Sequence, residues 1–224
     1  MSVKDPGSFR LVATLGATGL VAGLVLASVF LGTKPAIERN RAEALRAAIL
    51  GLLPGTETIT ELRPEGGELV GRPPGGESAG GELVYSARDA AGDLLGYAVP
   101  AEGPGYMDTV GLIYGYEPRN RTIVGIAILE SRETPGLGDK IIADPAFHEN
   151  FRRLRVEPTI VPVKRGRKNS ANEVDCITGA TISSEAVVTI LNRSVERWIP
   201  LLKEPPRRER ASDAAAASVP GGGP

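Results

Sequence analysis

The chain has 224 residues, a formal net charge of −1 and a single cysteine. This length suits one domain of ordinary size with additional segments. The near-neutral charge, the few aromatic residues and the lack of a recognition motif argue against nucleic acid as a partner. One cysteine excludes an intramolecular disulfide and any multi-cysteine metal or iron–sulfur site within the chain. We therefore expect Cys176 to be a small buried apolar residue and the lone His148 to lie at the surface.

The segment from Leu11 to Gly32 has no charged residue and consists mostly of leucine, valine, alanine and glycine. Its length predicts a single transmembrane helix at 11–32, preceded by a short N-terminus at 1–10. A cleaved signal peptide is the main alternative, but its apolar core should be shorter and should end in a small-residue cleavage site. A buried helix of a soluble protein is a further alternative. Basic residues bracket both ends, so charge leaves the orientation open.

Residues 33–55 are predicted to form a linker helix, because apolar residues fall on one face of Ala36–Leu53 and Pro54-Gly55 ends the pattern. A folded domain at 56–203 and a disordered tail at 204–224 follow. The first part of the domain should contain strands at 56–62, 83–86, 94–99, 110–116 and 123–129. Arg63 and Pro64 should close the first strand, and residues 64–82 read as a surface insertion. The apolar run 123–129 predicts burial on both faces.

The second part of the domain is predicted to contain a short helix at 144–154, a strand at 160–163 and a final helix at 183–198. Phe147, Phe151 and Leu154 have helical spacing, which favours a role in the core over contact with a ligand. Residues 164–168 form a basic turn. A solvated surface is its simplest interpretation, and a docking patch for an acidic partner or for lipid headgroups stays open.

The segment Asp175–Ser183 predicts a short strand, a tight turn of small residues and the start of a helix. Gly179 and Ala180 leave room for a ligand to approach the backbone, and Thr178, Thr181 and Ser183 place hydroxyl groups around the same turn. A helix start offers free N–H groups and a partial positive charge, which suit a phosphate. An ordinary capped helix is the alternative. The role of Asp175 stays open between presenting a threonine and stabilising the turn.

A second motif lies upstream, at Glu133-Thr134-Pro135-Gly136-Leu137-Gly138. Proline and two glycines fix a turn and remove side chains, so the backbone can lie against a flat ligand. Glu133 and Thr134 add hydrogen-bonding groups at its edge. Without further information, a plain turn and a ligand-binding loop are equally good interpretations.

Together, these two motifs resemble those of the FMN-binding domain family. That family includes the G subunit of Rnf electron-transport complexes and the C subunit of the sodium-translocating NADH:quinone reductase. Thr178-Gly179-Ala180-Thr181 matches the attachment motif, in which the last threonine carries FMN through a phosphodiester bond. The resemblance implies that Thr181 is the attachment residue and that Glu133, Thr134, Leu137 and Gly138 lie beside the isoalloxazine ring. It also implies a separate flavin transferase that uses FAD and a divalent metal.

Two positions depart from the family pattern and affect the expected flavin surroundings. Ser131 stands where a histidine is frequent, and Gly105-Tyr106-Met107-Asp108 keeps only the first half of a Gly-Tyr-Gly-Gly segment. The four-residue attachment motif is intact, so we expect the attachment itself to be retained. The missing dinucleotide fingerprint argues against binding of NADH by this chain.

The resemblance implies an α+β fold, in which a single transmembrane helix is followed by one extracytoplasmic FMN-binding domain. The implied function is electron relay in an Rnf-type ion-translocating complex of the cell inner membrane, alongside membrane and iron–sulfur subunits. Two alternatives stay open: the C subunit of the quinone reductase, and a stand-alone anchored flavin module of another respiratory or regulatory system. An anchored scaffold that has lost its flavin is a third.

Overall fold

The computed structural model describes residues 8–72 and 83–202. The predicted tail at 204–224, most of the N-terminus at 1–10 and residues 73–82 of the predicted insertion lie outside the described residues. The chain divides into two compact units, Met1–Ala47 and Ala48–Pro224.

One helix, α1 (Ser8–Leu52), includes both the predicted transmembrane segment and most of the predicted linker helix. It continues through Pro35, which cannot donate a backbone hydrogen bond. Its large apolar side chains are exposed, including Leu15 at 78% and Leu26 at 73%. Thr14 and Thr18 donate their hydroxyls to carbonyls four residues earlier, so these groups are satisfied without water. By length and composition, α1 could cross a membrane.

The second unit is built on a sheet with the order β2-β1-β3-β4-β5-β6-β7, in which every neighbouring pair is antiparallel. The strands are β1 (Thr58–Glu65), β2 (Glu68–Arg72), β3 (Val84–Arg88), β4 (Leu94–Pro104), β5 (Thr109–Glu117), β6 (Thr122–Glu130) and β7 (Leu154–Arg155). A separate parallel pair consists of β8 (Val161–Val163) and β9 (Glu173–Asp175). The remaining helices are α2 (Lys140–Ala143), α3 (Pro145–Glu149) and α4 (Thr181–Trp198).

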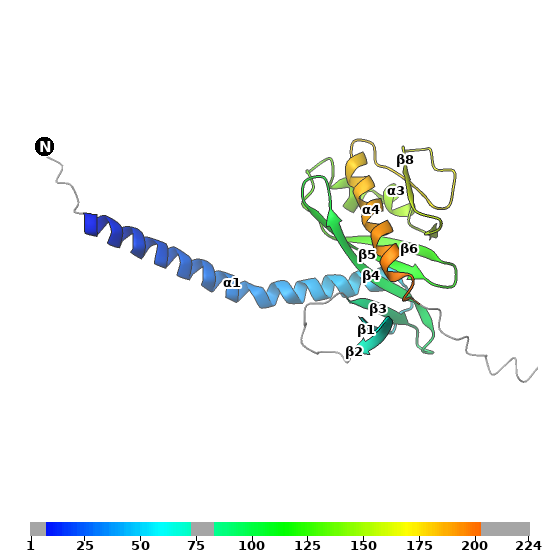
Figure 1. Cartoon of the computed structure of the whole chain (residues 1–224), viewed down its shortest axis with the longest axis horizontal. Coiled ribbons are helices and arrows are strands. Elements are labelled where there is room, and N and C mark those ends of the chain that lie inside the picture. Colours follow the sequence, from blue (N-terminus) through cyan, green and yellow to red (C-terminus); the bar gives the residue numbers. More distant parts are fainter. Residues whose placement is uncertain (1–7, 73–82, 203–224) are drawn as a thin grey trace, which may run out of the picture. The chain divides into compact units, whose positions relative to one another are not determined.

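Helix α4 lies against β4 and crosses the large sheet (Figure 1). Its buried face includes Val187, Ile190 and Leu191, which join the main core formed with the sheet. The approach is close at Gly103 of β4, where a Cβ would lie 2.8 Å from Ile190 Cγ1. The predicted helix at 183–198 is therefore correct in type, and it starts two residues earlier.

Glycines on adjacent strands of the sheet form a groove against which the last residues of α1 pack. Gly115 of β5 pairs with Gly125 of β6, and the side chain of Leu52 lies over both. Leu53, which is 5% exposed, reaches Gly96 of β4 in the same way. The missing side chains on three adjacent strands thus make room for the last apolar residues of the predicted linker helix.

Filling this groove should destabilise the domain. At Gly115 a Cβ would lie 2.8 Å from Val124 Cγ2 and 3.4 Å from Leu52 Cβ. We expect Gly115→Ala to lower the free energy of unfolding by about 1–3 kcal/mol, the usual cost of overpacking. Gly111→Ala on the same strand is the control, because its Cβ would meet Glu130 at an ordinary 3.5 Å. Denaturant unfolding of the full chain in detergent measures both, and equal effects would contradict the groove as the cause.

The predicted hairpin from 83–86 to 94–99 is present with longer strands, but the prediction for 56–82 is partly wrong. Strand β1 continues through Arg63 and Pro64, and β2 occupies part of the predicted insertion. Gly66 and Gly67 both have positive φ, which suits a two-residue hairpin turn. Pro64 is tolerated because β3 pairs with β1 only as far as Leu62, which leaves Pro64 a neighbour on one side alone.

Two other predictions need correction. The helix predicted at 144–154 is shorter: α3 ends at Glu149, and farther along the chain Arg153 has a left-handed φ of 59° and Leu154 belongs to β7. Its three apolar residues are nevertheless buried in the core, as expected. Residues 123–129 are not buried on both faces, since only Ile123 and Ile126 of this run are buried and Leu129 is 41% exposed. Helix α2 was not predicted.

Candidate functional site

The predicted strand, turn and helix start are present at residues 173–181. Strand β9 leads into a turn in which Gly179 has a φ of 82°, and α4 begins at Thr181. Ser184, which is fully buried, holds the turn: its hydroxyl accepts from Ile177 N at 3.0 Å and donates to the carbonyl of Ala180 at 2.9 Å. The helix start is thereby fixed to the end of the strand.

The N-terminus of α4 has no side-chain cap, because its N-cap residue is Ala180. No acceptor within the described part of the chain bonds the backbone N–H groups of Thr181, Ile182 and Ser183. These groups carry the partial positive charge of the helix start. A Cβ on Gly179 would have no neighbour within 4 Å, so the approach to the turn is open. This arrangement favours a bound anion over the alternative of an ordinary capped helix.

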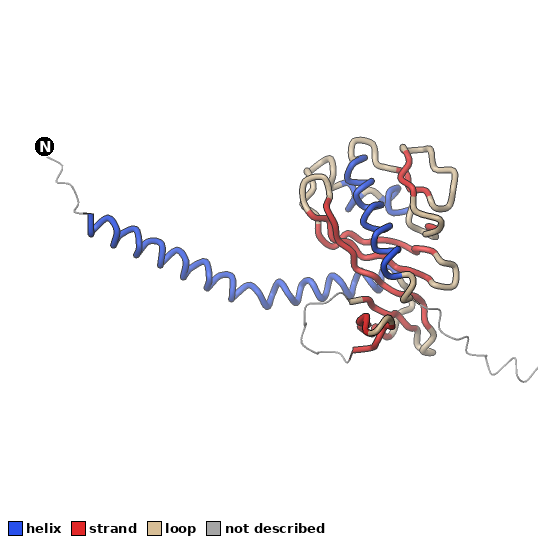
Figure 2. The backbone as a smooth tube through the Cα atoms, viewed as in Figure 1, coloured by secondary structure: helices blue, strands red, loops and turns tan. Residues whose placement is uncertain are grey.

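Two loops complete the site. The loop 131–139 turns so that Thr134 O accepts from Leu137 N at 3.1 Å, and Leu137 is 50% exposed. The loop between β4 and β5 is closed by a 2.8 Å bond from Gly105 N to Asp108 O and presents Tyr106, which is 60% exposed. Both loops lie at the same end of the domain as the start of α4 (Figure 2).

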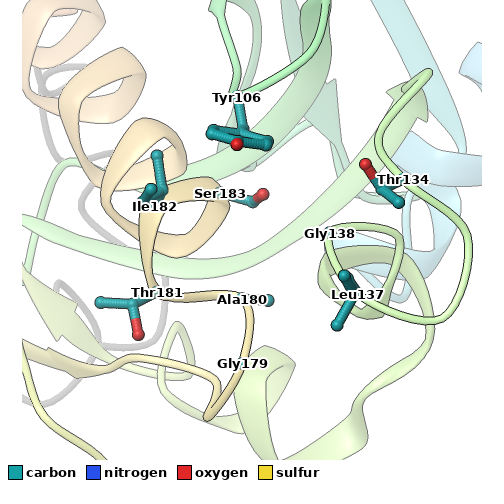
Figure 3. Close-up of a pocket in the computed structure, with 9 residues that line it drawn as sticks. All are labelled: Tyr106, Thr134, Leu137, Gly138, Gly179, Ala180, Thr181, Ile182 and Ser183. Carbon is teal, nitrogen blue, oxygen red and sulfur yellow. The ribbon is translucent and has the colours of Figure 1, made fainter.

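Together these segments surround a pocket of about 330 Å³. In Figure 3, Thr181 and Ile182 lie on one side, Thr134 and Leu137 on the other, and Tyr106 at the top. The lining consists of Tyr106, Thr134, Leu137, Gly138, Gly179, Ala180, Thr181, Ile182 and Ser183. The exposed ring of Tyr106 and the alkyl groups of Leu137 and Ile182 suit a flat, largely apolar ligand, while the helix start suits its anionic end.

The structure brings most of the predicted site residues together in this pocket. Seven of them line it: Thr134, Leu137, Gly138, Gly179, Ala180, Thr181 and Ser183. Three do not. Thr178 is exposed on the turn, and Asp175 accepts bonds at 3.1 Å from Arg167 N and Lys168 N, so it stabilises the basic turn. Glu133 lies behind the lining, 5% exposed.

Sequence reasoning missed Tyr106 and Ile182 as lining residues. In the sequence, Tyr106 stands out only for the departure from a family segment, although an exposed aromatic residue beside glycine in a hairpin loop is a usable signal. Ile182 follows the attachment motif directly and has the pattern of an ordinary helix residue. Cys176 is buried as expected, and burial raises the pKa of its thiol, with a smaller contribution from Glu185.

Comparison with known proteins shows which family the chain belongs to. Residues 105–196 match the FMN-binding domain family, and this range includes every segment of the pocket. A G subunit of an ion-translocating oxidoreductase complex from Methanosarcina acetivorans is 30% identical over 84% of this chain and 92% of its own length. The G subunit of a Na⁺-translocating ferredoxin:NAD⁺ oxidoreductase complex from Acetobacterium woodii is 30% identical over 87% and 93%.

The fold of this chain resembles those of two solved structures. The crystal structure of NqrC from Shewanella oneidensis aligns with a TM-score of 0.53 at 19% identity, over 72% of this chain and 93% of that one. The C subunit of a Na⁺-translocating NADH-quinone reductase from Parabacteroides distasonis gives a TM-score of 0.54 at 23% identity, over 67% and 80%. The predicted α+β class, with a long apolar helix before the domain, is confirmed. The chain belongs to the family of G subunits of ion-translocating oxidoreductase complexes and contains an FMN-binding domain.

Proposed function

We propose that this chain carries FMN covalently on Thr181 and relays electrons within an Rnf-type ferredoxin:NAD⁺ oxidoreductase complex. The observation that carries the proposal is the pocket, which joins Thr181 at a free helix start to the loop around Leu137. Neither motif alone makes a site, but the fold places both around one cavity. The two G subunits described above match this chain over 92% and 93% of their own length, whereas a C subunit of the quinone reductase matches over 45% of its length. This difference favours the Rnf-type complex over the quinone reductase.

The residues of the pocket fit the two ends of FMN. The free N–H groups of Thr181, Ile182 and Ser183 would hold the phosphate, helped by the charge of the helix start. Tyr106 and Leu137 would contact the isoalloxazine ring at the open rim. Thr134 offers a hydroxyl at the same edge. When bound, FMN supplies reversible electron uptake and release, while the protein sets its position and surroundings.

Attachment would make one bond and break one. The Thr181 hydroxyl oxygen attacks the phosphorus on the FMN side of FAD, AMP leaves, and the hydroxyl proton is lost. No described residue makes a hydrogen bond to the Thr181 hydroxyl, and an unactivated threonine is a poor nucleophile. We therefore infer that a separate flavin transferase with a divalent metal performs this step.

We further propose that α1 anchors the chain in the cell inner membrane as a single span at 11–32. This segment covers about 33 Å at 1.5 Å per residue, and its large apolar side chains are exposed. The domain would lie on the extracytoplasmic side, beside the membrane and iron–sulfur subunits of the complex. A reporter enzyme fused to the C-terminus, active only outside the cytoplasm, measures this orientation; an inactive but expressed fusion would overturn it.

The test of the proposed function is the intact mass of the full chain, expressed with and without a flavin transferase. We expect a gain of one FMN less one water only when the transferase is present, because a phosphodiester forms with loss of water. Fragmentation of the modified peptide then locates the adduct. An unmodified chain in the presence of active transferase would overturn the proposal and favour a scaffold that has lost its flavin.

A further inference from the structure

Behind the pocket, the side chain of Glu133 connects all three segments that surround it. Oε1 accepts from the backbone N–H groups of Tyr106 at 2.8 Å and Met107 at 3.1 Å. Oε2 accepts from the hydroxyl of Ser183 at 2.6 Å. Glu133 and Ser183 are 5% and 3% exposed. A single buried carboxylate thus bonds the β4–β5 loop and the start of α4 while belonging to the third segment.

Two glycines pack directly against this carboxylate. A Cβ on Gly105 would collide with Oε1, and a Cβ on Gly138 would lie 2.5 Å from Oε2 and 2.8 Å from the Ser183 hydroxyl. One glycine therefore abuts each carboxylate oxygen. These two glycines belong to the two loops of the pocket, so both loops pack directly against Glu133.

The free energy of burial favours a role for Glu133 in holding the three segments together. Burying a charged group costs free energy unless it is hydrogen-bonded, and three donors satisfy this one. The bonded residues are separated from Glu133 by 27, 26 and 50 positions, so the contacts join segments that local structure does not hold together. Losing the carboxylate would leave two part-buried amides and the buried Ser183 hydroxyl without their acceptor.

We propose that Glu133 is the positioning residue of the flavin pocket. Through Tyr106 and Met107 it fixes the loop on the ring side, and through Ser183 it fixes the helix start that bears Thr181. It thereby sets how the ring lies relative to its attachment point and contributes a negative charge just behind the lining. The role toward flavin rests on the proposed function, whereas the connection among the three segments does not.

Hydrogen exchange tests the connection in the full chain in detergent, without flavin. We expect Glu133→Ala to speed exchange of the Tyr106 and Met107 amides by about 10- to 100-fold, the range for a lost bond to a charged acceptor. Glu133→Gln should keep most of the protection, because its carbonyl can accept both amides. Ser183→Ala should speed exchange at the same two amides, although it contacts neither. If Glu133→Ala does not fold, exchange in Glu133→Gln and Ser183→Ala tests the connection instead.

A second readout tests the effect on the cofactor. Reduced flavin carries more negative charge, so removing a nearby negative charge should make the midpoint potential of attached FMN more positive in Glu133→Gln. Glu185→Gln is the matched control, because it removes the same charge from an exposed position of α4.

Unchanged hydrogen exchange in Ser183→Ala would overturn the connection among the three segments. Equal potentials in the two glutamine variants would overturn the influence on flavin. A chain that takes up no flavin would refute the proposed function and leave the exchange result valid.

Discussion

Replacing Thr181 with alanine is expected to abolish covalent flavin attachment while leaving the fold intact. Thr181 is exposed and lines the pocket at the first position of α4, and its side chain caps nothing there. Stability should therefore change by no more than about 0.5 kcal/mol, as for other exposed substitutions without a structural role. Intact mass after co-expression with the transferase measures attachment, and denaturant unfolding measures stability.

Matched threonine variants make this result specific. Thr178→Ala removes the other threonine of the motif, which is exposed but does not line the pocket, and Thr189→Ala removes an exposed threonine farther along α4. Both should keep the flavin mass. Thr181→Ser should keep part of it, because it retains a hydroxyl group. Loss of the adduct in Thr178→Ala with retention in Thr181→Ala would move the attachment site to Thr178.

Much of the fold could be predicted because local patterns decided it. The apolar segment, the strands of the β3–β4 hairpin and the final helix follow from periodicity and from β-branched composition. The errors occurred where pairing overrode local signals. Pro64 reads as a strand breaker, yet it sits where β1 has a neighbour on one side only. The apolar run 123–129 suggested burial on both faces, but in β6 only Ile123 and Ile126 of this run are buried.

The site was predictable to the extent that its chemistry is contiguous in sequence. The two motifs supplied seven lining residues, and the fold supplied Tyr106, which lies far from both. The orientation of Glu133 could not be read from the sequence. In the motif it precedes a threonine at a loop edge, which suggested contact with the ligand. Its actual partners at 106, 107 and 183 become neighbours only in the folded domain.

Gly138→Ala is expected to disturb the flavin site by displacing Glu133. The added Cβ would lie 2.5–2.8 Å from the Glu133 side chain and the Ser183 hydroxyl, so the carboxylate must move away from at least one partner. Overpacking of this kind costs about 1–3 kcal/mol of stability. We expect a lower fraction of chains bearing FMN and a shifted visible absorption spectrum of those that do, since the loop beside the ring no longer has one position.

Gly136→Ala separates this effect from a general weakening of the loop. Gly136 lies two residues earlier, where φ is 78° and a Cβ would meet nothing within 4 Å. Alanine there adopts a strained left-handed conformation at a cost of about 1–2 kcal/mol, comparable to the cost at Gly138. The two variants should therefore lose similar stability, but only Gly138→Ala should change flavin content and spectrum. If both change the flavin equally, the loop acts through its own rigidity. If neither variant changes the flavin content or spectrum, the contact between Gly138 and the Glu133 carboxylate does not affect the cofactor. Both variants weaken the loop to a similar extent, and only Gly138→Ala disturbs that contact.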